Sequence, residues 1–293
     1  MMTVNVRIGL HTSTAGGLHK AAEQAIDLGA NTFQIFSGSP RMWHASMPRS
    51  SEVAALNRLR LAHDLAPLVI HGNYLINLAS LDPQIRAKSI IAFRGELERA
   101  RVIGAEYLVI HPGSYKDQSV EQGIYSFIEA MTEAVEGLDA GGVTLLLENT
   151  AGQGKALGSR LEELAQMRQM ALERTSLRIG YCIDTCHALA AGYDIAHEEG
   201  LALTVEFLDH LLGLGHIPVI HANDSQGALG SHLDRHANIG LGQIGEAGFA
   251  RIMQHPQLRD KAFILETPQD DGADRRDIAM LKQLGGSGQD ASE

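Results

Sequence analysis

Short apolar segments rich in valine, isoleucine and leucine recur along the chain. They alternate with longer segments whose apolar residues repeat every three to four positions. The first pattern is typical of buried strands, and the second is typical of amphipathic helices. The short segments predict eight strands, at Arg7–His11, Thr32–Phe36, Leu68–His71, Tyr107–His111, Thr144–Glu148, Ile179–Asp184, Pro218–His221 and Phe263–Glu266.

A helical segment follows each predicted strand. These segments lie at Leu18–Leu28, Ser51–Ala62, Pro83–Ile103, Val120–Ala140, Arg160–Leu172, Ala202–Leu212, Gly245–Met253 and Arg275–Leu284. Eight strand–helix units predict an α/β fold, a single (β/α)8 TIM barrel with its active site at the carboxyl ends of the strands. An open doubly wound sheet is the alternative. No G-x-G-x-x-G motif follows the first strand, which disfavours dinucleotide binding.

We expect residues 1–284 to form one catalytic domain. Residues 285–293 (GGSGQDASE) are polar and rich in glycine, and this composition predicts a disordered tail. The chain has no stretch of ~18 uncharged apolar residues, so no membrane span is expected. Its first residues, MMTVNVRIGLH, lack the basic and apolar blocks of a secretion signal, which favours a cytoplasmic location.

Net charge and cysteine content add two constraints. The chain has 35 acidic and 24 basic residues and a net charge of −11, whereas nucleic-acid-binding proteins usually present a basic face. Net charge says little about a local site, however, because bound divalent metals would offset part of it. Cys182 and Cys186 have the wrong spacing for a zinc pair and lack a second pair, so core packing is the favoured interpretation.

Six of the predicted strands end in a residue that can bind a metal ion. One such residue alone is more often a hydrogen-bonded histidine or a carboxylate that caps the next helix. In a barrel, however, all the strand ends meet at one mouth, and six uncompensated polar groups there would be costly without a cation. We therefore predict metal ligands at His71, His111, Glu148, Asp184, His221 and Glu266.

The segment His221–Gly245 (HANDSQGALGSHLDRHANIGLGQIG) supplies further candidates. Asp234 and His236 are two residues apart, so an extended backbone points both the same way. His187 follows Asp184 by three residues, which brings the candidates to nine. One ion needs three or four ligands, so nine indicate two or three metal ions with a bridging carboxylate. Nitrogen and oxygen ligands fit Zn²⁺ best, with Mn²⁺ as the alternative.

Three other polar residues near these positions are weaker candidates. Asp224 and His232 are assigned supporting or loop roles. His11 ends the first predicted strand and faces the mouth, so a supporting role and no role are equally open.

Longer motifs surround the candidate ligands. They are HGNYLIN from His71, VIHPGS around His111, LLLENTAGQG around Glu148, CIDTCHALAAGYD from Cys182, the segment His221–Gly245, and ILETP around Glu266. With these motifs in this order, the chain resembles the endonuclease IV family of apurinic/apyrimidinic (AP) endonucleases, which are zinc-dependent DNA repair nucleases. The resemblance runs from about Arg7 to Leu284.

The resemblance implies three zinc ions per chain, with Mn²⁺ as the alternative at one site. The first would be held by His71, His111 and Glu148. Glu148 would bridge to the second, which is completed by Asp184, His221 and Glu266. The third would be held by His187, Asp234 and His236.

The implied reaction is hydrolysis of the phosphodiester bond 5′ to an abasic site in double-stranded DNA. A zinc-activated hydroxide would leave a 3′-hydroxyl and a 5′-deoxyribose phosphate. Glu148 and Glu266 are the implied catalytic residues, with Glu266 helping to orient the nucleophile. The resemblance also implies a monomer, and no nucleotide cofactor is expected.

Recognition of an abasic site needs side chains that fill the gap left in the base stack. The resemblance implies that Arg41, Tyr74 and Leu75 are the DNA-penetrating residues. Arg41 lies in SGSPRMWHASMPRSS, which also holds the only tryptophan, Trp43. Ser39 stands where the family usually has asparagine.

Two other functions stay open. Sugar isomerases or epimerases with a xylose-isomerase-like barrel resemble this chain in their strand-end Glu, Asp, His and Glu residues, but they would not require the Asp234–His236 pair with His187. A non-catalytic binding barrel is disfavoured because the candidate ligand sets are complete. The number of bound metal ions would distinguish the first two functions.

Overall fold

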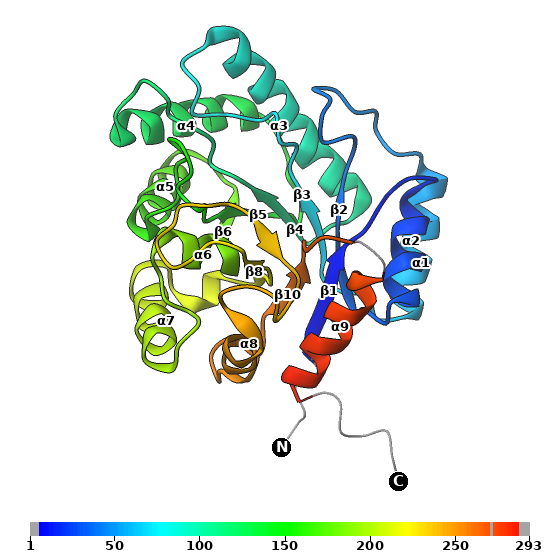
Figure 1. The fold of residues 1–293 in the computed structure, drawn as a ribbon. Helices are drawn as coiled ribbons and strands as arrows, with labels where there is room; N and C mark the ends of the chain where they lie inside the picture. The colour runs from blue at the N-terminus through cyan, green and yellow to red at the C-terminus, as the bar shows by residue number, and fades with distance from the viewer. Residues whose placement is uncertain (1–5, 270–271, 287–293) are drawn as a thin grey trace.

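The structure is a computed structural model that describes residues 6–269 and 272–286. Eight parallel strands close into a barrel in the spatial order β1-β10-β7-β6-β5-β4-β3-β2, and helices surround it (Figure 1). This confirms the predicted TIM barrel. The barrel strands are β1 (Arg7–His11), β2 (Thr32–Phe36), β3 (Leu68–His71), β4 (Tyr107–Ile110), β5 (Thr144–Glu148), β6 (Arg178–Asp184), β7 (Val219–His221) and β10 (Ala262–Leu265).

The helices pack against the outside of the barrel. Within the described ranges, none combines the length and apolarity needed to span a membrane. They are α1 (Leu18–Asp27), α2 (Ser50–Ala62), α3 (Pro83–Ile103), α4 (Val120–Val135), α5 (Leu161–Arg174), α6 (Thr185–Ala191), α7 (Glu198–Leu212), α8 (Gly245–Gln254) and α9 (Ala273–Leu284), with a 3-10 turn at Leu214–His216.

Strands β4 and β10 end one residue earlier than predicted, so His111 and Glu266 directly follow their strands, and two predicted helices differ by more than two residues. The helix predicted over Val120–Ala140 ends at Val135, because the chain turns through Gly137, whose φ of 67° lies in the left-handed region. The helix predicted from Ala202 begins at Glu198. The predicted tail lies outside the described residues except for Gly285 and Gly286, which directly follow α9.

Four short elements were missed by the prediction, one of which is the 3-10 turn at Leu214–His216. Helix α6 starts at the residue after β6, so no loop separates the strand pattern from the helix pattern. The segment His221–Gly245 contains two short strands, β8 (Asp224–Ser225) and β9 (His236–Ala237), which pair antiparallel. Two-residue strands are too short to produce an alternating pattern in sequence.

A close approach of β1 and β2 shapes one side of the barrel mouth. A Cβ atom on Gly9 would lie 1.9 Å from the carbonyl oxygen of its register partner Thr32, so only glycine fits there. Two residues further along, His11 and Gln34 form the next inward-facing register pair. The strands therefore bring these two polar side chains side by side.

The inside of the barrel has an apolar layer directly below a polar one. Val69, Val109, Leu146, Cys182, Val219 and Ile264 form a fully buried cluster. Side chains in a strand alternate between its two faces, so the residue two positions later points to the same side. Counting two from each member gives His71, His111, Glu148, Asp184, His221 and Glu266. Strand periodicity thus places all six predicted strand-end residues on one apolar floor.

Candidate metal centre at the barrel mouth

Glu148, at the end of β5, lies at the centre of the polar layer. Its side chain has no exposed surface. Oε2 is 3.2 Å from Nε2 of His71 and 3.5 Å from Nε2 of His111, while Oε1 is 2.9 Å from Nδ1 of His221. The Nδ1 atom of His71 is 2.8 Å from the carbonyl oxygen of Gly72 and donates to it, which leaves Nε2 to face the carboxylate. One carboxylate therefore joins imidazoles from three strands.

Asp184 and Glu266, at the carboxyl ends of β6 and β10, join Glu148 and His221 in a second group of candidate ligands. Asp184 is fully buried, and its Oδ1 accepts a hydrogen bond from the backbone N–H of His187, capping α6. Glu266 follows β10, and its Oε2 lies 3.2 Å from Nδ1 of His221. The short helix α6 thus begins on a predicted ligand, which fixes the position of His187.

His187, Asp234 and His236 meet at the edge of the mouth. Nε2 of His187 lies 3.2 Å from Oδ1 of Asp234, and Nε2 of His236 lies 3.6 Å from the same atom. The backbone carbonyl of Asn149 accepts a hydrogen bond from Nδ1 of His187, and that of Glu266 accepts one from Nδ1 of His236. Both imidazoles therefore direct Nε2 toward Asp234.

The nine predicted ligand residues fall into three groups whose ligand-capable atoms lie within 4.8 Å of one another. Within the described ranges, Nε2 of His236 is buried without a hydrogen-bond partner. Imidazole nitrogens and carboxylate oxygens at this spacing, with one nitrogen unpartnered, fit divalent cations. The groups are His71, His111 and Glu148; Glu148, Asp184, His221 and Glu266; and His187, Asp234 and His236.

Mutual attraction between these groups sets their pKa values. Burial alone would raise the pKa of Glu148, but the facing imidazoles of His111 and His221 hold it well below its usual range. Burial opposes the charged form of His187, yet the carboxylates of Asp184 and Asp234 outweigh it and raise the pKa to about 10. The hydrogen bond from His187 in turn lowers the pKa of Asp234 to about 2. The carboxylates are therefore ionised and available to cations.

The two cysteines lie in the core, as the sequence predicted. Cys182 belongs to the apolar cluster inside the barrel. Cys186 lies within reach of Asp184 and His236, but burial raises the pKa of its thiol to about 12. A thiol that stays protonated is a poor metal ligand.

Three side-chain amides that the sequence analysis missed support the candidate ligands. The amide of Asn149 accepts from the backbone N–H of Asp184 at 2.6 Å. The amide of Asn223 donates to Oδ2 of Asp184 at 2.6 Å and accepts from the backbone N–H of Glu266 at 2.8 Å. The third is Gln34 in β2. Asn149 and Asn223 lie one and two residues after a predicted ligand, and Gln34 interrupts an apolar run; the sequence offers no stronger signal.

The loop His221–Gly245 is organised by Asp224, which the sequence analysis had assigned a supporting or loop role. The carboxylate is fully buried and accepts hydrogen bonds from the backbone N–H groups of Ser225, Gly240, Gly242, Ile244 and Gly245 at 2.8–3.2 Å. His232, the other loop residue, is hydrogen-bonded through Nδ1 to the carbonyl oxygen of Ala151 at 2.9 Å. These bonds hold the loop that carries Asp234 and His236.

The predicted DNA-contacting residues lie on two neighbouring loops at the rim. Arg41 is exposed on the Arg41 loop (residues 37–49). Tyr74 is 62% exposed and Leu75 is partly buried on the Tyr74 loop (residues 72–82). The amide of Asn73 donates to the carbonyl oxygen of Met42, which ties the two loops together. The Tyr74 ring packs edge-on against Phe36, 5.2 Å away.

A buried ion pair on α3 anchors the base of the Arg41 loop. Arg99 lies 3.1 Å from Glu96, and both side chains are almost fully buried. Nε of Arg99 donates to the hydroxyl of Ser37 at 2.7 Å, and Nη1 donates to the carbonyl oxygen of Ala45 at 3.3 Å. Ser37 donates in turn to Glu96. The start and the middle of the loop are therefore fixed to one helix.

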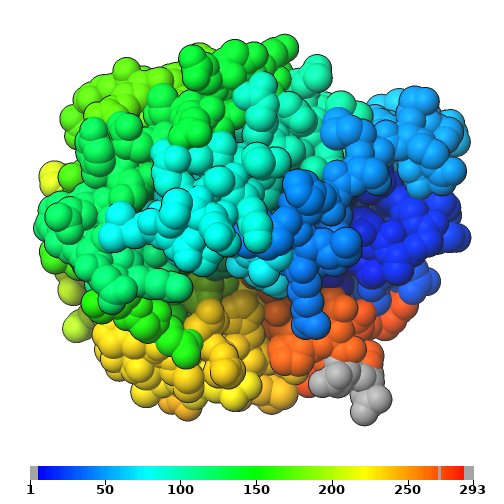
Figure 2. Space-filling view, turned by 90° about the horizontal axis from the view of Figure 1, so that it is seen from above, coloured from blue at the N-terminus to red at the C-terminus, as the bar shows by residue number. Residues whose placement is uncertain are grey.

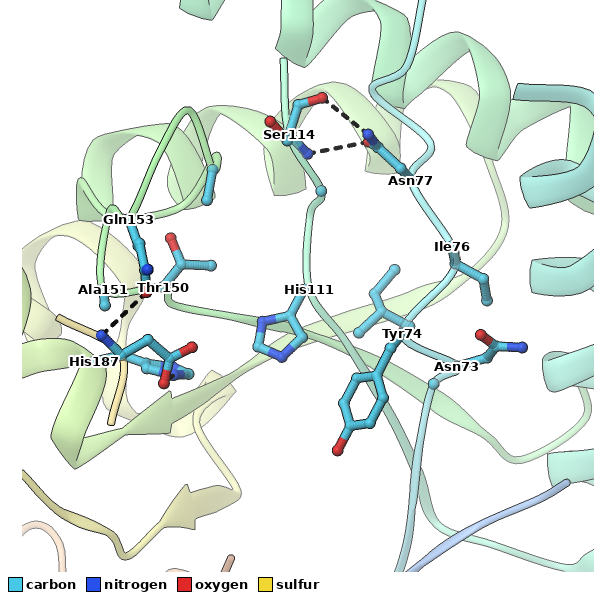
Figure 3. A pocket seen from close by; sticks show the side chains of 15 residues that line it. Asn73, Tyr74, Ile76, Asn77, His111, Ser114, Thr150, Ala151, Gln153 and His187 are labelled. Atoms are coloured by element: carbon cyan, nitrogen blue, oxygen red, sulfur yellow. Dashed lines mark hydrogen bonds and ion pairs between the residues drawn. The ribbon is translucent and has the colours of Figure 1, made fainter. Parts of the chain in front are cut away.

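The mouth opens into clefts on both sides of Tyr74. One, of about 420 Å³, is lined by His111, His187 and Asp234 among others, and in Figure 3 His111 lies between His187 and Tyr74. The other, of about 690 Å³, is lined by Glu266 and His236 among others. Seen from above in Figure 2, the cyan and blue segments that include the Tyr74 and Arg41 loops lie side by side, with the yellow segment below them. A substrate can therefore extend across the whole mouth.

Comparison with known proteins identifies the class of barrel. Residues 22–284 match the family model described as xylose isomerase-like TIM barrel. A D-tagatose 3-epimerase-like protein of known structure has a TM-score of 0.67 at 19% identity, over 94% of this chain and 96% of that one. At this level of identity the likeness shows the fold alone.

More similar relatives define the family. A probable endonuclease 4 of Solibacter usitatus is 56% identical and covers 96% of this chain and 98% of its own length. Endonuclease 4 of a Thermus thermophilus strain is 42% identical, and the match covers 94% of this chain and 97% of that protein. The crystal structure of endonuclease IV from another strain of Thermus thermophilus has a TM-score of 0.84 at 39% identity. The match covers 96% of this chain and 99% of that chain. The chain belongs to the endonuclease IV family, which confirms the resemblance noted in its sequence.

Replacing Asp224 with alanine is expected to release the loop between β7 and α8. Five backbone N–H groups would lose a charged acceptor, and hydrogen bonds to charged groups contribute about 1.5–3 kcal/mol each. We expect faster amide hydrogen exchange at residues 240–245 and a lower free energy of unfolding. Asp139→Ala is the control, because Asp139 is exposed and its carboxylate accepts a backbone bond from Gly141. Equal protection in the two variants would contradict the role of Asp224.

Proposed function

We propose that this protein is a DNA repair endonuclease that hydrolyses the phosphodiester bond 5′ to abasic sites in double-stranded DNA. The observation that carries the proposal is the arrangement of three candidate metal groups around buried Glu148 in a member of the endonuclease IV family. The products would be a 3′-hydroxyl and a 5′-deoxyribose phosphate. We further propose that the enzyme acts as a monomer in the cytoplasm.

The three groups would each hold one zinc ion, with Mn²⁺ as the alternative at one of them. Glu148 would bridge the first two ions, because its two oxygens face different imidazoles. His187, Asp234 and His236 would hold the third, and the unpartnered Nε2 of His236 supports this assignment. Bound divalent cations supply Lewis acidity toward phosphate oxygens and lower the pKa of water.

Protein groups would orient the reactants around this centre. Glu266 is partly exposed to the mouth, and His221 and His71 outweigh its burial and lower its pKa to about 2. An ionised carboxylate at this place can accept a hydrogen bond from an attacking water and orient it. The apolar floor beneath keeps other water away from the buried side of the site.

The rim loops would recognise the abasic nucleotide. Arg41, Tyr74 and Leu75 would fill the gap in the base stack, since Tyr74 and Arg41 are exposed beside the clefts. Extrusion of an abasic nucleotide costs less than extrusion of a paired base, which favours the damaged site. Partial burial of the Tyr74 ring against the mouth, together with the charge of Glu266, raises the pKa of the phenol to about 12, so it stays neutral beside DNA phosphates.

The proposal is tested with a duplex that carries one abasic site. We expect a single cut 5′ to the site, abolished by a metal chelator and restored by zinc. Glu148→Gln should reduce the cleavage rate by at least about 100- to 1000-fold, the range for losing one electrostatic stabiliser, while circular dichroism shows an intact barrel. Glu206→Gln, at an exposed position on α7, is the matched control. Near-normal cleavage by Glu148→Gln would refute the mechanism.

The number of bound metal ions tests the nuclease against the sugar isomerase or epimerase alternative. Three groups predict about three zinc ions per chain by elemental analysis. Asp234→Ala should remove about one of them and leave the others, because Asp234 belongs only to the third group. One or two ions in the unaltered protein would favour the sugar-modifying activity.

Tyr74→Ala should weaken binding to abasic DNA without changing metal content. Aromatic stacking on nucleic acid contributes about 1–3 kcal/mol, so Kd should rise about 5- to 150-fold. Fluorescence anisotropy with a catalytically inactive background measures Kd, and elemental analysis measures zinc. Tyr74→Phe should retain binding, and Tyr125→Ala, on the exposed face of α4, serves as the control. An unchanged Kd for Tyr74→Ala would remove Tyr74 from recognition.

A further inference from the structure

Gln34 is an amide buried inside the barrel with no exposed surface. It lies in the middle of β2, in the sequence TFQIF, and its register partner on β3 is Val69. Its side chain therefore occupies a position level with the apolar floor and reaches up toward the candidate metal centre. An uncharged polar group without partners would be costly at this depth, so its hydrogen bonds matter.

Gln34 contacts two of the nine candidate ligands. Its Oε1 lies 2.8 Å from Nε2 of His221, and its Nε2 lies 2.6 Å from Oε1 of Glu266. The same Nε2 lies 3.1 Å from Nδ1 of His11. One side chain thus spans the space between β1, β7 and the end of β10.

The chemistry of the partners fixes which way the amide points. An ionised carboxylate can only accept a hydrogen bond, so the atom next to Glu266 must be the amide nitrogen. The amide oxygen then faces His221 and can only accept, so Nε2 of His221 must carry the proton. With a cation held between Nδ1 and the carboxylates of Glu148 and Glu266, which lie 2.9 and 3.2 Å from that atom, the neutral imidazole would keep its proton on Nε2 and offer the lone pair of Nδ1.

We propose that Gln34 is a positioning residue for the second metal group. It fixes the tautomer of His221 with Nδ1 free to bind a cation, and it holds the carboxylate of Glu266 in place. His11 completes the arrangement by accepting the second amide proton at Nδ1. Gln34 does not itself touch substrate. A glutamate at this position would face the carboxylate of Glu266 with like charge, which explains why the chain uses an amide.

This inference rests on the proposed metal-binding function, so its test measures metal affinity directly. Gln34→Met nearly preserves the side-chain volume and removes all three hydrogen bonds, to His221, Glu266 and His11. Groups that orient metal ligands typically contribute about 10- to 100-fold to affinity. We expect the zinc bound by the second group to be lost at a chelator concentration about 10- to 100-fold lower than in the unaltered protein. The Co²⁺-substituted variant should also show shifted absorption bands.

The controls separate metal positioning from packing. Ile35→Met changes the next residue of β2, which is fully buried on the opposite face against the helices, and should leave zinc affinity and the Co²⁺ spectrum unchanged. Gln34→Asn shortens the side chain by one methylene, so the amide no longer reaches His221 and Glu266. This variant should lose zinc affinity as Gln34→Met does. It replaces Gln34→Met if that variant does not fold. In abasic-duplex assays at limiting zinc, kcat should fall while KM stays constant.

Different outcomes overturn different claims. Chelator curves and Co²⁺ spectra of the Gln34 variants that match the unaltered protein would overturn the positioning role and leave the nuclease proposal intact. An equal loss of zinc in Ile35→Met would also overturn it, because packing of β2 would then be the cause. Unaltered protein that binds no zinc and does not cut an abasic duplex would instead refute the proposed function.

Discussion

A fully buried carboxylate surrounded by imidazoles is the constraint on which the rest of this molecule depends. Glu148 has no exposed surface, and a charge in that position is tolerated only where opposite charge balances it. His71, His111 and His221 approach it from three different strands. Only a closed parallel barrel brings these strand ends to one point, and only strand alternation turns all of them inward above the apolar floor. The fold and the site are therefore one arrangement: a change in the register of any of these strands would move a charged side chain into the packed layer around the barrel.

Around this charged centre the chain uses three side-chain amides, one of which contacts the imidazole of His11. Gln34, Asn149 and Asn223 each hold candidate ligands through bonds of 2.6–2.8 Å. An amide can donate and accept at once and adds no net charge, so it orients a carboxylate or an imidazole without changing the charge that a cation must balance. Asp224 is a further buried acid, but its charge is satisfied by backbone N–H groups rather than by the candidate ligands.

The rim differs from the centre in how it is held. The Arg41 loop and the Tyr74 loop, which we propose for recognition, are linked to each other by Asn73, and the buried pair Glu96–Arg99 fixes the base of the Arg41 loop. Their tips, including Arg41 and Tyr74, remain exposed. Side chains that insert into a DNA base stack have to be exposed, whereas the base of the loop that carries them has to be held in one position. The net charge of −11 does not oppose the proposed binding, since cations held by the candidate ligands would set the local field at the mouth.

The sequence by itself determined the barrel and the residues that meet at its mouth, because both follow from local periodicity: apolar runs define strands, and the residue that ends each run faces inward. Its longer motifs also identified the family. The tertiary structure alone decided which of these side chains face one another and what supports them. Gln34 lies 187 residues from His221 and 232 from Glu266, and no local pattern connects positions so far apart. The same holds for Asp224, whose loop-organising bonds form only when residues 240–245 fold back onto it. Hydrogen-bond partners depend on direction and distance in space, and sequence spacing carries neither across separate strands.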